Sequence, residues 1–60
     1  MKTRKDLLQD LFLAVRKNFL NKGVIEENAN AVARAIYMRV AFDDKMTNED
    51  IKTLRNEFLK

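Results

Sequence analysis

The apolar residues of this 60-residue chain recur mostly three and four positions apart, the spacing that aligns side chains along one side of an α-helix. The first stripe contains Leu8, Leu11, Phe12, Val15 and Phe19, with Leu7 at its margin. The second contains Ala29, Val32, Ala33, Ile36 and Val40. The third contains Ile51, Leu54 and Phe58, with Leu59 nearby. The pattern therefore predicts an all-α chain with three amphipathic helices.

Capping residues give the expected limits of these helices. Thr3 with Asp6, and Thr47 with Asp50, follow the spacing of a capping box, in which two residues satisfy each other's backbone amides. Gly23 is the residue that most easily takes the left-handed conformation at the end of a helix. We predict a single domain over residues 1–60, folded as a small three-helix bundle with helices at about 4–22, 26–42 and 48–59.

The second predicted helix has two weak ends. Ile25 occupies its N-cap position, where a side chain with an oxygen acceptor would add about 1 kcal/mol of stability. Asp43 and Asp44 follow its carboxyl end, where the helix dipole favours cations over anions. We expect that something other than local helix stability has determined these residues.

The second helix also has two apolar faces, because another row of apolar residues lies nearly opposite its main stripe. In one interpretation this helix is the centre of the bundle, between the first and third helices. In the other, which does not exclude the first, two copies of the chain form a homodimer through helices 1 and 2. A pair of leucines one heptad apart also lies outside the main stripe of the first helix. The candidate interface residues are Leu13, Leu20, Ala31, Ala35, Met38 and Phe42.

The composition removes most catalytic and metal-binding chemistry, because the chain has no His, Cys or Ser. It has neither disulfides nor the usual ligands of structural zinc. The acidic segment 43–50 fails the calcium-loop pattern, since Lys45 and Met46 interrupt it and it has no glycine. We therefore predict a protein that is not an enzyme and has no catalytic residues, no cofactor, no metal and no small-molecule substrate. No segment resembles an export signal or a membrane span, so we predict a soluble, cytoplasmic protein.

Twelve basic and nine acidic residues give a net charge of +3, which permits an acidic partner such as nucleic acid. The stretch from Phe12 to Val32 has the outline of a helix-turn-helix. Phe19 is large for the close approach of such helices, and Glu26 with Glu27 would repel phosphates. The candidate nucleic-acid contacts of this alternative are Lys2, Arg4, Lys5, Arg34 and Arg39.

The succession of a leucine-rich helix, the Gly23-Val24 turn and an alanine-rich helix resembles the amino-terminal, dimerising part of small phage transcription activators of the Mor type. The resemblance carries over no site residue. From the residues themselves we expect a small regulatory or inhibitory protein, of the kind found in phages and plasmids, that binds another protein and itself through helix surfaces. The alternatives are a nucleic-acid-associated protein or small transcriptional regulator, and a subunit of a larger assembly.

Overall fold

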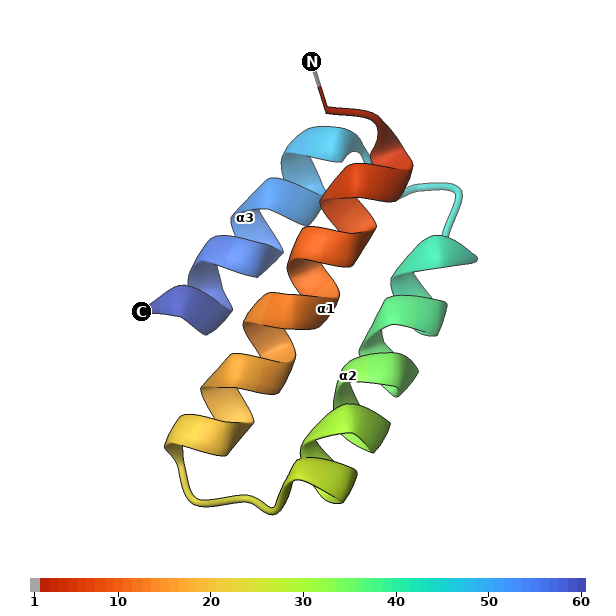
Figure 1. The fold of residues 1–60 in the computed structure, drawn as a ribbon. Helices are drawn as coiled ribbons and strands as arrows, with labels where there is room; N and C mark the ends of the chain where they lie inside the picture. Colours follow the sequence, from red (N-terminus) through yellow and green to blue (C-terminus); the bar gives the residue numbers. More distant parts are fainter. Residues whose placement is uncertain (1) are drawn as a thin grey trace.

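A computed structural model describes residues 2–60 and confirms the three-helix architecture. The helices are α1 (Arg4–Asn21), α2 (Glu26–Ala41) and α3 (Asn48–Leu59), and each end lies within one residue of its predicted position. α2 runs back antiparallel to α1, and α3 returns along the other side of α1 (Figure 1). None of the helices within residues 2–60 combines the length and the apolar run that crossing a membrane requires.

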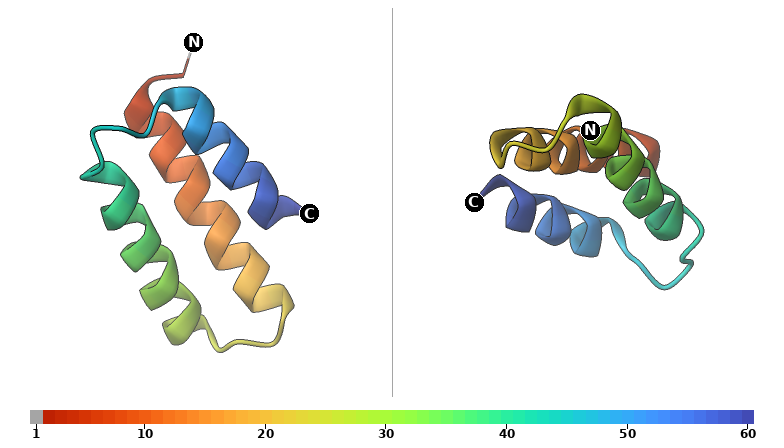
Figure 2. Two further views of the ribbon diagram at one scale, coloured as in Figure 1. Left: turned by 180° about the vertical axis from the view of Figure 1, so that it is seen from behind. Right: turned by 90° about the horizontal axis from the view of Figure 1, so that it is seen from below.

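The central helix of the bundle is α1, so the prediction that the second helix is central is wrong. α1 packs against both α2 and α3, whereas α2 and α3 barely touch (Figure 2). The reason is the width of its apolar arc: at the helical rotation per residue, Phe12 on the α2 side and Ala14 on the α3 side are about 160° apart. Ala14 is buried and lies outside the predicted stripe, because a single alanine gives little periodic signal.

The core gathers between α1 and its two neighbours. Its buried residues are Leu7, Leu8, Leu11, Val15, Ala33, Val40 and Ile51. The main predicted stripe of α2 faces this core, with Ala29, Ala33 and Val40 buried. α3 buries Ile51 and partly buries Leu54 and Phe58 against the same cluster, so it covers one side of α1.

The predicted caps are all present. Thr3 and Asp6 form one capping box, and Thr47 and Asp50 form the other. Gly23 has a φ of 89°, and the amides of Gly23 and Val24 donate to the carbonyl oxygens of Leu20 and Phe19, which completes a Schellman ending. The N-cap Ile25 makes no side-chain hydrogen bond, so the start of α2 lacks a side-chain cap, as the sequence indicates.

Arg4 explains how α2 ends beside two aspartates. Its guanidinium donates to the backbone carbonyl oxygens of Val40 (3.2 Å), Asp43 (3.1 Å) and Met46. The positive charge therefore sits at the carboxyl end of α2, where the helix dipole favours a cation. Because Arg4 belongs to α1, the same contacts hold the α2–α3 loop against the central helix.

Candidate protein-binding surface

The second apolar row of α2 faces away from the bundle. Its four residues, which we call the α2 outer face, are all exposed and are Ala31, Ala35, Met38 and Phe42. Met38 retains 48% of its accessible surface and Phe42 retains 80%, the largest exposed fraction of any large apolar side chain within residues 2–60. Within residues 2–60, α1 covers only the opposite side of α2, so this row has no apolar partner.

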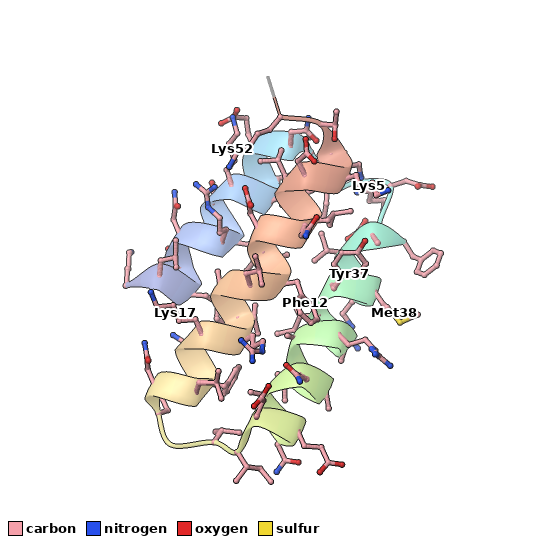
Figure 3. All side chains as sticks on the ribbon, in the orientation of Figure 1. Lys5, Phe12, Lys17, Tyr37, Met38 and Lys52 are labelled. Carbon is pink, nitrogen blue, oxygen red and sulfur yellow. The ribbon has the colours of Figure 1, made fainter. Side chains whose placement is uncertain are left out.

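A shallow depression of about 590 Å³ lies between the α2 outer face and α1. Its lining residues are Phe12, Glu27, Asn30, Ala31, Arg34, Ala35 and Met38. Phe12 comes from α1 and meets Tyr37 of α2 edge to face, with ring centroids 6.3 Å apart (Figure 3). The two rings pack against each other. Phe12 makes the α1 side of the depression apolar, and the depression continues into the exposed row of α2.

The start of α2 is tied to α1 by one side chain. The Arg16 guanidinium donates to Asn30 Oδ1 at 2.7 Å and to Glu26 Oε1 at 2.9 Å. These contacts set the level at which α2 lies along α1. They thereby position Asn30 and the neighbouring residues at the edge of the depression.

Unlike Arg16 and Glu26, the charged residues around the α2 outer face form no ion pairs within residues 2–60. Glu27 and Arg34 line the depression, and Arg39 is exposed on the same helix. None of the three takes part in an ion pair within residues 2–60. Their charges are therefore available to a second molecule.

The six candidate interface residues do not all share this surface. Leu13 is 52% exposed and lines a separate depression between α1 and α3, together with the exposed Leu59. Leu20 is half-buried. The structure thus brings together the four candidates on α2 and leaves the two leucines of α1 outside that group.

The five basic candidates for nucleic-acid contact are also dispersed. Lys2 pairs with Asp10 and lines the α1–α3 depression, and Arg4 is bonded to three carbonyl groups at the end of α2 and in the loop after it. Arg34 lines the α1–α2 depression instead. Lys5 and Arg39 are exposed.

Three features of the structure were not predicted from the sequence. Phe12 belongs to the main stripe of the first helix, and it also forms one wall of the depression. Leu59 was placed beside the α3 stripe, and it is 55% exposed. The contacts of Arg4 had one signal in the sequence, because two aspartates after a helix call for a cation from elsewhere in the chain.

Within residues 2–60 no cluster of carboxylates is arranged to hold a metal ion. The acidic segment between α2 and α3 is instead a turn, in which Asp43 Oδ1 accepts from the Lys45 amide and Thr47 caps α3. Comparison with known proteins gives no match to any family model, curated protein or solved structure.

Proposed function

We propose that this chain is a small, non-enzymatic regulatory or inhibitory protein of the cytoplasm, of the phage or plasmid type, that acts by binding another protein chain through the α2 outer face. The observation that carries the proposal is the exposure of Met38 and Phe42 in line with Ala31 and Ala35 on one side of a single helix.

Burial against a partner would stabilise this face. Covering a Met or Phe side chain contributes about 1.5–3 kcal/mol when it is fully removed from water. Met and Phe are enriched in protein interfaces. A helix with apolar anchors beside an apolar depression also matches the mode in which a helix of one protein lies in a groove of another.

The nucleic-acid alternative has less support from the contacts. It requires several cations on one surface, whereas Lys2 is paired with Asp10 and Arg4 is used within the fold. Of the cations on α2, Arg34 shares its depression with Glu27, whose charge would repel phosphates. Binding that falls steeply with salt concentration would favour this alternative over a protein partner.

The test is Ala35→Glu, because it places a charge in the centre of the exposed row while keeping a good helix former. We expect an unchanged helical circular dichroism spectrum and loss of partner binding. Immobilised wild type, Ala35→Glu and a control, Gln9→Glu, would each be exposed to a host extract treated with nuclease. Gln9→Glu adds the same charge at an exposed position of α1.

A partner retained by wild type and Gln9→Glu, and lost with Ala35→Glu, would then be purified and its complex reconstituted at defined stoichiometry. Equal retention by all three proteins would contradict the proposal. So would a partner that is retained only from extract that has not been treated with nuclease.

A further inference from the structure

Two opposite charges lie on the same flank of the α2 outer face. Glu27 and Arg34 both line the depression beside Ala31, and neither has an ion-pair partner within residues 2–60. They are seven positions apart, so after about two turns of helix they are nearly in line along the α2 axis. This face thus carries an anion toward its amino end and a cation farther along.

Such a flank is complementary to a second copy of itself when the two helices run antiparallel. A two-fold axis between antiparallel helices sets the same flank of each helix side by side. Glu27 of one copy then faces Arg34 of the other, and the contact occurs twice. In a parallel two-fold pair this flank of one helix lies on the opposite side of the contact from the same flank of the other, so Glu27 and Arg34 are not brought together.

The position of the crossing supports this arrangement. The midpoint between residues 27 and 34 lies beside Ala31, which is exposed and has the small side chain that close helix packing needs. Ala35 follows one turn later on the same face. Large or charged residues at these two positions would hold the helices apart.

We propose that a second copy of this chain occupies the Ala31 and Ala35 part of the α2 outer face, docked as an antiparallel two-fold pair of α2 helices with two Glu27–Arg34 ion pairs. This inference rests on the proposed function, since it names the partner of the same surface. With the two-fold axis level with Ala31, the two α2 helices overlap over about residues 26–35. Ala31 and Ala35 therefore lie in the contact, whereas Met38 and Phe42 lie beyond the start of the partner's α2.

Charge reversal tests the pairing directly. Glu27→Arg and Arg34→Glu each create two like-charge contacts, and each is expected to weaken self-association by at least about tenfold, measured by light scattering or sedimentation over a range of concentrations. The double variant restores both pairs with reversed polarity and is expected to dimerise again. Mixing the two single variants is expected to give a heterodimer, because each chain then supplies the charges that the other needs.

The control is Glu57→Arg, which changes the net charge as Glu27→Arg does at an exposed position of α3. It should leave the dimer intact. A wild-type chain that is monomeric at all concentrations would overturn the inference, as would a dimer that ignores both single reversals. Failure of the folded double variant and of the mixture to associate would also overturn it.

Failure of this inference can be told apart from failure of the proposed function. A monomeric chain that still loses a reconstituted protein partner through Ala35→Glu keeps the proposed function and refutes self-docking. If charge reversal and rescue support the dimer, but Ala35→Glu binds that partner as tightly as wild type, then self-docking stands. The proposed binding of another protein through this face is then refuted.

Discussion

At the scale of single residues, Arg4 shows how one side chain can serve two elements. A guanidinium offers several N–H donors in a fixed plane, so it can bond several carbonyl groups at once. Here it bonds the carbonyls of Val40, Asp43 and Met46, which belong to the end of α2 and the loop after it. Its charge offsets the unfavourable placement of Asp43 near the carboxyl end of α2.

We predict that Arg4→Gln lowers the free energy of unfolding by about 1–2 kcal/mol, because it removes charge-assisted hydrogen bonds from a half-buried site. Arg4→Lys should recover only part of this stability, since an ammonium group cannot span three carbonyls in the same way. The neighbouring Lys5→Gln is the matched control, because Lys5 is exposed and has no side-chain contact of this kind. Urea unfolding followed by circular dichroism measures all three, and equal midpoints for Arg4→Gln and Lys5→Gln would refute the role of Arg4.

At the scale of elements, the three helices differ in how their ends are satisfied. α1 and α3 begin with complete capping boxes, whereas α2 begins at Ile25 without a side-chain acceptor. The backbone of Ile25, with φ −65° and ψ 151°, already has the extended conformation of an N-cap. Contacts from α1, notably those of Arg16 with Glu26 and Asn30, compensate for the missing cap.

We therefore predict that Ile25→Ser stabilises the chain. The hydroxyl can accept from the first turn of α2, and the expected gain is about 1 kcal/mol, or about 4–8 °C in melting temperature for a domain of this size. Little apolar contact is lost, because Ile25 is 62% exposed. Ile25→Ala removes the same side chain without adding an acceptor, so thermal unfolding should place it at or below wild type; a gain equal to that of Ile25→Ser would show that the cap is not the cause.

At the scale of the whole molecule, stability depends on α1, because the other two helices pack mainly on it. Leu11 and Val15 lie on the inner side of α1 and are completely buried. A domain of 60 residues has a total stability of roughly 3–9 kcal/mol, so a single cavity in this helix removes a large share of it.

We predict that Leu11→Ala lowers the free energy of unfolding by about 2–5 kcal/mol, the range for a buried leucine truncated in a packed core. Leu54→Ala removes the same atoms from a half-buried position on α3 and should cost about 1–2 kcal/mol. Denaturant unfolding of both variants at low protein concentration compares them directly. Similar losses would contradict the central place of α1.

The sequence by itself determined the number of helices, their limits and most of the core, because these depend on residues within about four positions of one another. Thr47 with Asp50 and the glycine at position 23 specify their local structures without reference to the rest of the chain. The α2 residues of the candidate surface also followed from periodicity, since an apolar row opposite the main stripe is visible in the sequence.

Only the tertiary structure decided which helix is central, which apolar face of α2 is covered and where Arg4 binds. Periodicity shows that α2 has two apolar faces, but it does not say which neighbour covers either one. The answer depends on how wide an arc of α1 can pack against other helices. The buried Ala14 widens this arc, so that α3 packs on α1 on the side of Ala14. Contacts such as those of Arg4 join residues some forty positions apart, so they exist only once the helices have packed.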